Sequence, residues 1–272
     1  CDITCGSVDS SFGIDRCVLA HVSSLARSER CAVCETGDAF PSRNLPHPKE
    51  SAQRMCGIVG VVSTQPVNQQ IYDSLLLLQH RGQDSSGIAT ADGSQFHMVK
   101  VKGQVREAYR TRDMRMLVGN VGLGHVRYTT RGSAASDEEA QPFYVNAPYG
   151  ITLVHNGNLT NTRELAAELY NVDRRHLNTH SDTELLLNVL ANELQSSIGG
   201  LSLDAAQVFD AVAGVHSRVE GSYSVIAMIA GHGLLAFRDP LGIRPLVLGR
   251  RYTELHREEW IVASESLVLE SG

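Results

Sequence analysis

The chain has 272 residues, 42% of them hydrophobic, with 24 basic against 30 acidic side chains. This length allows one large domain or two small ones with a substantial core. The mildly acidic balance argues against nucleic acid or an anionic membrane surface as a partner, and no apolar run approaches the roughly 20 residues that cross a bilayer. We therefore expect a soluble cytoplasmic protein with a small-molecule partner.

The first 55 residues differ in character from the rest. Residues 1 to 54 show no sustained periodicity and end in the breaker-rich tract "FPSRNLPHPKESAQR", which is typical of a disordered leader, a pro-segment or sequence upstream of a start at Met55. Cys31 and Cys34 have the spacing of half a zinc site, but no second half follows, so metal binding is not favoured. Cys56 is the only cysteine after this segment, and the absence of any possible disulfide beyond it fits a reducing cytosol.

Regular elements begin after Cys56. The β-branched run from Ile58 to Val62 predicts a buried strand, and "NQQIYDSLLLLQHRG" predicts a helix that ends at Gly82. The segments "GIAT" and "FHMVKVKG" flank Asp92-Gly93, a pair that indicates a tight hairpin turn.

The second half continues with strands and helices. The segments "VGLGHVRY" and "ITLVHNG" predict strands, and two helices are expected to begin with capping boxes, Asn161 with Glu164 and Ser181 with Glu184. A third helix has Val208, Val212, Val215 and Val219 on one stripe. The tail pairs "SYSVIAMIAG" with "LLAFRD" and "RPLVLG" with "WIVASES" as short strands. Strands that arrive in hairpin-like pairs favour an antiparallel α+β fold over a parallel sheet.

Cys56 is the first candidate catalytic residue. If Met55 and everything before it are removed, the thiol becomes a nucleophile and the free α-amine, with a pKa of about 8, becomes a base suited to neutral pH. A small buried cysteine at the start of a core strand is the simpler alternative.

Four further residues could complete a site. Asn156 and Gly157 in "HNGN", at the expected end of a strand, could offer a side-chain amide and a backbone N–H to an oxyanion, although a plain type I′ turn fits as well. Arg127 could bind a carboxylate, or be a surface arginine. Asp182 could hold an ammonium group, or only favour a helix start. Together they describe attack on the side-chain amide of an α-amino acid, and glutamine fits.

Several motifs together resemble a known family. In chain order they are "CGIVGVV", "LQHRGQDSSGIA", "GHVRYTTRG", "VHNGNLTN", "HSDTELLL" and "FRDPLGIRPL". They resemble the class II glutamine amidotransferases, the N-terminal-nucleophile type, from Cys56 to the end of the chain. Within the class, "RDPLGIRPL" in particular resembles the amidophosphoribosyltransferases, which make 5-phosphoribosylamine in the first step of purine biosynthesis. The glucosamine-6-phosphate synthases are the alternative, but they typically have Trp and Ala where this chain has Tyr128 and Thr129.

The resemblance implies a fold and a set of roles. The fold would be a four-layer αββα sandwich of two antiparallel sheets, covering residues 56–272 after the 1–55 segment. Cys56 would be the nucleophile, Asn156 and Gly157 the oxyanion hole. Arg127 would bind the glutamine α-carboxylate and Asp182 its α-amine. Arg81 would line the pocket near the nucleophile.

The family also carries a phosphoribosyltransferase domain that this sequence does not contain. That domain would be the ammonia acceptor and would use Mg²⁺. Some family members also hold an iron–sulfur cluster, whose ligands would lie in the same missing part. No cofactor is expected in the present chain, and the full-length protein is expected to be a homo-oligomer.

Two rival interpretations remain from the sequence. A Cys–His pair, with His125, His155 or His180 as the base, would need no processing. A non-enzymatic alternative is an unprocessed chain that binds glutamine without turning it over.

Overall fold

The computed structural model describes residues 55–128, 139–197, 203–254 and 256–270, and the backbone of 4–7 and 17–21. Its strands form two six-stranded sheets, ordered β1-β2-β10-β9-β8-β7 and β11-β12-β3-β6-β4-β5. The first sheet comprises β1 (Thr4–Ser7), β2 (Cys17–His21), β7 (Phe143–Val145), β8 (Ile151–Leu159), β9 (Gly221–Ile229) and β10 (Gly233–Arg238). The second comprises β3 (Gly57–Val62), β4 (Ser85–Asp92), β5 (Gln95–Lys102), β6 (Val121–Arg127), β11 (Val247–Tyr252) and β12 (Glu258–Ala263). All neighbouring strands from β3 onward pair antiparallel.

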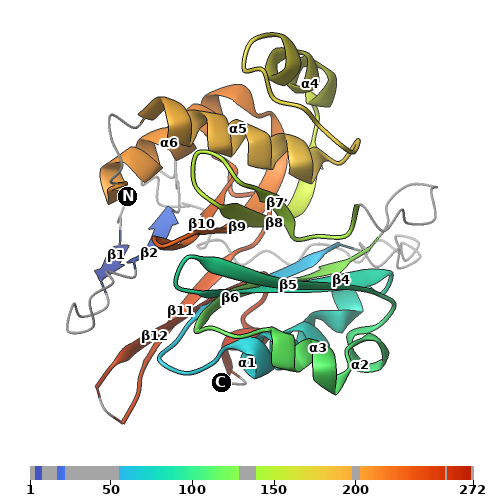
Figure 1. Ribbon diagram of the computed structural model, residues 1–272, viewed down its shortest axis with the longest axis vertical. Helices are drawn as coiled ribbons and strands as arrows, with labels where there is room; N and C mark the ends of the chain where they lie inside the picture. The colour runs from blue at the N-terminus through green and yellow to red at the C-terminus, as the bar shows by residue number, and fades with distance from the viewer. Residues whose placement is uncertain are drawn as a thin grey trace, which may run out of the picture.

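The two sheets face each other and helices cover their outer sides (Figure 1). Above the first sheet lie α4 (Thr162–Asn171), α5 (Asp182–Ser197) and α6 (Ala205–Arg218). Beneath the second lie α1 (Asn68–Leu77), the 3₁₀ turn η2 (Leu78–Arg81), α2 (Val105–Ala108), α3 (Thr111–Met116) and α7 (Leu267–Glu270). The expected four-layer αββα sandwich is thus confirmed.

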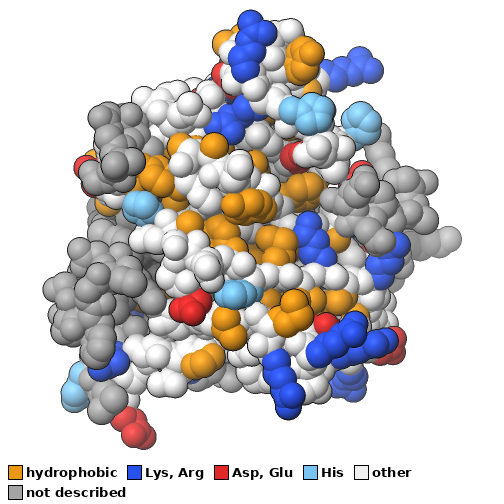
Figure 2. Space-filling model, viewed as in Figure 1, with side chains coloured by type: hydrophobic (Ala, Val, Ile, Leu, Met, Phe, Trp, Pro, Cys, Tyr) orange, Lys and Arg blue, Asp and Glu red, His pale blue; other side chains and the backbone are white. Residues whose placement is uncertain are grey.

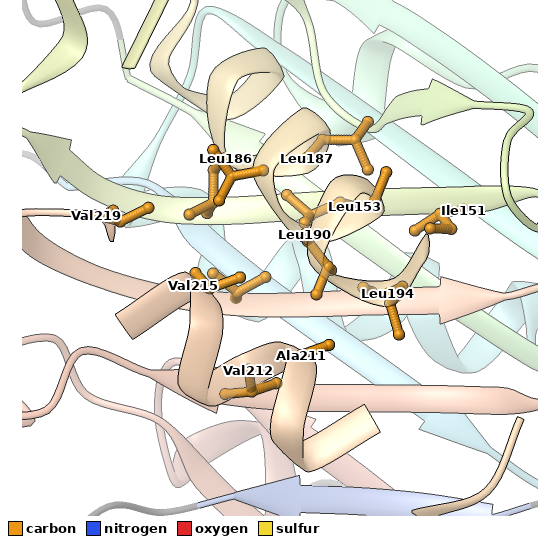
Figure 3. Packing of buried hydrophobic residues seen from close by; sticks show 14 of the residues in the cluster. Ile151, Leu153, Leu186, Leu187, Leu190, Leu194, Ala211, Val212, Val215 and Val219 are labelled. Carbon is orange, nitrogen blue, oxygen red and sulfur yellow. The ribbon is translucent and has the colours of Figure 1, made fainter. Parts of the chain in front are cut away.

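Apolar side chains fill each of the interfaces between layers. Ile58 and Val62 of β3 pack between the sheets with Val154 and Ile226 of the opposite sheet, as strand alternation requires. On the outer face of the first sheet, leucines of α5 and valines of α6 pack over β8 and β9, as Figure 3 shows. The predicted valine stripe of α6 is confirmed, because its members are buried in this cluster.

On the outer face of the second sheet, α1 packs so closely on β6 that a glycine is required at the contact. A Cβ atom on Gly124 would lie 2.7 Å from Ile71, below any normal contact distance. The predicted helix over residues 68–82 is confirmed, with its last turn tightened to 3₁₀ geometry in η2. The hairpin between β4 and β5 is also confirmed. Asp92 still pairs with Gln95, so the two connecting residues are Gly93 and Ser94 and not Asp92 and Gly93.

Both predicted capping boxes are wrong. The side chain of Asn161 makes no cap bond to α4 and instead bridges Arg218 O and Glu220 N. Ser181 does accept from Thr183 N at 3.3 Å, but Glu184 turns back to bind the backbone N–H groups of residues 178 and 179. Tertiary contacts therefore outweigh the local capping pattern. A complete capping box is formed instead at the start of α6, by Asp204 and Gln207.

The segment before Met55 was expected to lack regular structure, yet it contains two short strands. Strand β2 adds to β10 in parallel register, and β1 pairs with β2. A sheet edge exposes unpaired backbone groups that accept another strand whatever its side-chain pattern. The proposed zinc half-site, Cys31 and Cys34, lies outside the described residues.

The surface in Figure 2 shows apolar side chains in scattered groups and a gathering of Lys and Arg toward the lower right, over the region of α2 and α3. Within the described residues, no helix combines the length and hydrophobicity required to span a bilayer.

Candidate active site

Cys56 lies directly before β3, where the strand enters the sheet. Its thiol is partly buried, and Sγ lies 3.9 Å from the carbonyl oxygen of Tyr128. Burial raises the pKa of the thiol, Asp182 adds to that effect, and the positive charges of Arg127 and Arg81 act against it. The fold therefore gathers Arg81, Arg127 and Asp182 around Cys56, and at neutral pH the thiol keeps its proton.

Arg81 lies behind the nucleophile. It is buried, its Nε donates to the carbonyl oxygen of Cys56 at 2.9 Å, and its NH1 pairs with Glu265 at 2.5 Å. NH2 is buried without a partner among the described residues. These contacts place Arg81 at the nucleophile, while its predicted contact with glutamine stays a prediction.

Asn156 and Gly157 lie within β8, so the expectation that a strand ends there is wrong, and a type I′ turn is excluded. Gly157 pairs with Tyr223 of β9, whose own N–H and C=O bond to Asp239 on the far side. The Gly157 N–H accordingly points away from β9, toward the same edge of β8 as the N–H groups of His155 and Leu159.

Those two neighbouring N–H groups are occupied, but that of Gly157 is not. His155 N donates to Gln141 Oε1 at 2.6 Å and Leu159 N donates to Asp182 Oδ2 at 3.3 Å. Nothing in the described chain accepts from the Gly157 N–H. A side chain at this position is not tolerated, since a Cβ atom on Gly157 would lie 2.0 Å from Ser222 O.

The Asn156 side chain faces the space between the two sheets. Val154, two residues earlier on the same face of β8, packs there with Ile58, which is two residues after Cys56 on β3. Asn156 is buried and its Nδ2 has no partner in the described parts of the chain. Two unused hydrogen-bond donors, Asn156 Nδ2 and Gly157 N–H, thus lie at the end of the sandwich where Cys56 enters its strand.

Arg127 is the last residue of β6, and one of its two terminal guanidinium nitrogens already has a partner. Its NH2 pairs with Glu139 Oε2 at 2.6 Å, and its NH1 is buried without a partner among the described residues. Asp182 begins α5, as predicted, with Oδ2 near Leu159 N and Oδ1 3.7 Å from His155 Nδ1. Each charged residue retains an atom for a further partner.

Sequence reasoning missed the residues that connect these parts. Gln141 is buried and joins β8 to α5, through both backbone groups of His155 and through Thr183 Oγ1. Asp239 is buried and accepts from the backbone of residues 223, 241, 243 and 244, which fixes the loop of "RDPLGIR". That loop brings the Arg244 side chain to Met55 Sδ. No local pattern signals such long-range contacts, although the motif around Asp239 was recognised.

The histidines give little support to a Cys–His pair. In the described ranges, no histidine nitrogen lies within hydrogen-bond distance of Cys56 Sγ. Burial lowers the pKa of His125 to about 3, with His155 and Arg127 contributing, and burial also lowers the pKa of His155. His180 is exposed.

The described residues also hold no group of three or more His, Cys, Asp or Glu side chains suited to a metal ion.

Comparison with known proteins agrees with the fold and identifies the family. The model of a glutamine amidotransferase domain matches residues 125–271. The chain is 53% identical over 218 residues to the amidophosphoribosyltransferase of Escherichia coli, which covers 80% of this chain and 43% of that protein. Identity to the Pasteurella multocida enzyme is 56%, with the same coverage, and to that of Schizosaccharomyces pombe 48%, covering 79% and 40%.

Solved structures point the same way. Glutamine phosphoribosylpyrophosphate amidotransferase from B. subtilis, solved with ADP and GMP, matches with a TM-score of 0.65 and 28% identity over 79% of this chain and 43% of that one. A structure described as the allosteric regulatory enzyme of purine biosynthesis matches with a TM-score of 0.66, also at 28% identity.

An antiparallel αββα sandwich with a cysteine at the mouth of a central strand is the architecture of N-terminal-nucleophile amidotransferases. The chain belongs to this family, the class II glutamine amidotransferases. The curated relatives that it matches at high identity carry the name amidophosphoribosyltransferase, and the chain spans less than half of their length.

Proposed function

We propose that this chain hydrolyses glutamine to glutamate and ammonia through a thioester on Cys56, and that the ammonia serves 5-phosphoribosylamine formation. The observation that carries the proposal is the pair of free donors, Asn156 Nδ2 and Gly157 N–H, at the end of the sandwich that holds the thiol. Such donors stabilise the oxyanion of a tetrahedral intermediate.

The base in this proposal is the α-amine of Cys56. Because burial raises the pKa of the thiol, a base must take its proton at neutral pH, and an α-amine with a pKa of about 8 is suited to that task. In the structure Met55 precedes Cys56, so that nitrogen is an amide. The proposal therefore requires removal of Met55 and everything before it.

Three charged residues are proposed to hold the substrate. The free NH1 of Arg127 would bind the α-carboxylate, and the carboxylate of Asp182 would bind the α-ammonium. Arg81, which contacts Cys56 O, would close the wall near the reacting amide.

The chemistry then runs in two halves. The amine takes the thiol proton as Sγ attacks the glutamine Cδ, and the carbonyl oxygen becomes an oxyanion held by the residues 156 and 157 donors. Collapse breaks the C–N bond, the protonated amine gives its proton to the leaving nitrogen, and ammonia departs. Water, deprotonated by the same amine, attacks the thioester, and the thiol and glutamate are released.

The acceptor of the ammonia is proposed to be a phosphoribosyltransferase domain of a longer protein. The names of the relatives and the share of their length outside this chain support that acceptor. Mg²⁺ and any iron–sulfur cluster would belong to that other part. We also propose that the enzyme works in the cytoplasm, where a free thiol persists. The full-length protein is proposed to be a homo-oligomer.

The test combines intact mass and glutaminase activity on one sample of purified protein. We expect activity only with a mass that begins at Cys56. The nearly isosteric change Cys56→Ser should remove most activity and leave the melting temperature within a few degrees. Full turnover by that variant, or full activity with residues 1–55 still attached, would contradict the proposed mechanism.

A second candidate function rests on the peptide bond between Met55 and Cys56. While that bond is intact the nitrogen has no basicity, and Arg244 contacts the Met55 side chain. In that form the chain would bind glutamine without hydrolysing it. Calorimetric binding of glutamine by protein of full mass, with no glutamate released, would identify this state.

A further inference from the structure

Cys56 lies outside the hydrogen-bond ladder that holds the rest of its strand. The first paired residue of β3 is Gly57, opposite Val126 of β6, and the pairing with β12 begins only at Val59. The carbonyl of Cys56 is held instead by a side chain, because Arg81 Nε donates to it at 2.9 Å. The position of the reacting residue therefore depends on how firmly Arg81 is held.

Glu265 holds Arg81. Its Oε1 accepts from Arg81 NH1 at 2.5 Å and from His80 Nε2 at 3.1 Å. The Arg81 side chain is only 8% exposed, whereas that of Glu265 is 28% exposed. The guanidinium is thus largely removed from water, and the Glu265 carboxylate is its only described charged partner.

Ser264, the residue before Glu265, is hydrogen-bonded to β3, the strand that follows Cys56. Ser264 Oγ accepts from Ile58 N at 3.0 Å, and Ser264 N donates to Ile58 O at 3.0 Å. Residues 264 and 265, just after β12, thereby fix the backbone at Ile58 directly and at Cys56 through Arg81.

We infer that Glu265 is a positioning residue for the nucleophile, which acts through Arg81 on the carbonyl of Cys56. This inference rests on the proposed function, because it assigns a role to a contact with the reacting residue. Displacing a reacting group by about 1 Å can cost on the order of a hundredfold in rate. Loss of Glu265 would therefore lower the rate of thioester formation without removing any group that binds glutamine.

The test is a mutant cycle in the processed protein whose mass begins at Cys56. Glu265→Ala is expected to lower kcat about tenfold or more and to leave the KM for glutamine within threefold. Glu265→Gln keeps an oxygen that accepts from Arg81 and should retain a higher kcat than the alanine variant. Glu270→Ala removes an exposed carboxylate on α7 and serves as the matched control, with wild-type kcat.

The double variant Arg81→Ala/Glu265→Ala decides whether Glu265 acts through Arg81. We expect it to be no slower than Arg81→Ala alone. Alkylation of Cys56 by iodoacetamide, which needs no glutamine pocket, should proceed at the wild-type rate in Glu265→Ala. A kcat within twofold of wild type in that variant, independent multiplying effects in the double variant, or a glutamine variant as slow as the alanine variant would overturn the inference.

The Cys56→Ala variant separates this inference from the proposed function. If Cys56→Ala still releases glutamate, the proposed function itself fails. If Cys56→Ala is inactive while Glu265→Ala keeps full kcat, only the positioning role fails. Melting temperatures of all variants identify any loss of rate that comes from unfolding.

Discussion

Arg127 shares its guanidinium with Glu139: NH2 lies 2.6 Å from Glu139 Oε2, and NH1 is buried with no partner in the described chain. The ion pair fixes the orientation of the guanidinium and leaves NH1 as a donor for a further partner. An incoming carboxylate would find a cation whose orientation is already set.

Replacing Arg127 should therefore weaken glutamine binding more than it slows the chemistry. We expect Arg127→Ala to raise the KM for glutamine about tenfold to a hundredfold, since a hydrogen bond to a charged group contributes about 1.5–3 kcal/mol. Arg112→Ala, on an exposed side chain, is the control. An unchanged KM in steady-state glutaminase assays would remove Arg127 from the binding site.

Replacing Asn156 should have the opposite kinetic effect, on kcat and not on KM. In the proposed mechanism its free Nδ2 binds charge that develops only in the transition state, so Asn156→Ala should lower kcat about a hundredfold to a thousandfold with little change in KM. Asn158→Ala, two residues along the same face of β8 but exposed, should leave kcat near wild type. Equal effects of the two substitutions would argue against an oxyanion hole.

Stability should depend on Arg218, which joins the ends of three helices. It lies 2.6 Å from Asp173, 2.7 Å from Glu193 and 3.2 Å from Glu168, and is only 13% exposed. Arg218→Ala leaves these carboxylates without their cation and should lower the free energy of unfolding by about 2–4 kcal/mol. Denaturant unfolding would measure the loss, with the exposed Arg163→Ala as control; equal midpoints for the two variants would contradict the prediction.

Glu259 should make stability depend on acid pH. Burial raises its pKa, but hydrogen bonds from Ser63, Arg251 and Thr64 outweigh burial and hold the pKa at about 2, below the usual 4.5. The unfolded chain takes up the proton first as the pH falls. Stability from this group is therefore fully present well above pH 4.5, where the carboxyl is ionised in both states, and is lost as the pH falls through 4.5 toward 2.

The change Glu259→Gln tests that dependence. The free energy of unfolding of the variant should be lower than wild type at pH 7, and the difference should shrink below pH 4.5. Glu254→Gln, exposed in the same hairpin, should follow the wild-type curve. A difference that stays constant from pH 7 to pH 3 would show that the carboxylate is not held in its charged form.

Local patterns were enough to place most elements. The β-branched run at residues 58–62, the stripe of α6 and the turn near Asp92 each depend on side chains close in sequence, and the structure has them where the sequence predicts. Patterns that offer the backbone alternative partners were not enough. Asn161 and Glu184 have capping spacing, but each finds a better partner elsewhere.

The sequence by itself indicated an antiparallel α+β fold, because its strands arrive in hairpin-like pairs. Through the resemblance carried by its motifs, it also implied the sandwich, the family, and the candidate residues Cys56, Arg81, Arg127, Asn156, Gly157 and Asp182. Only the tertiary structure decided which donors are free and which are engaged. The N–H groups of His155 and Leu159 bind Gln141 and Asp182, whereas the Gly157 N–H between them has no partner in the described chain. Arg81 meets a carboxylate 184 residues away. Hydrogen bonds depend on distances of a few ångströms between atoms that only folding brings together.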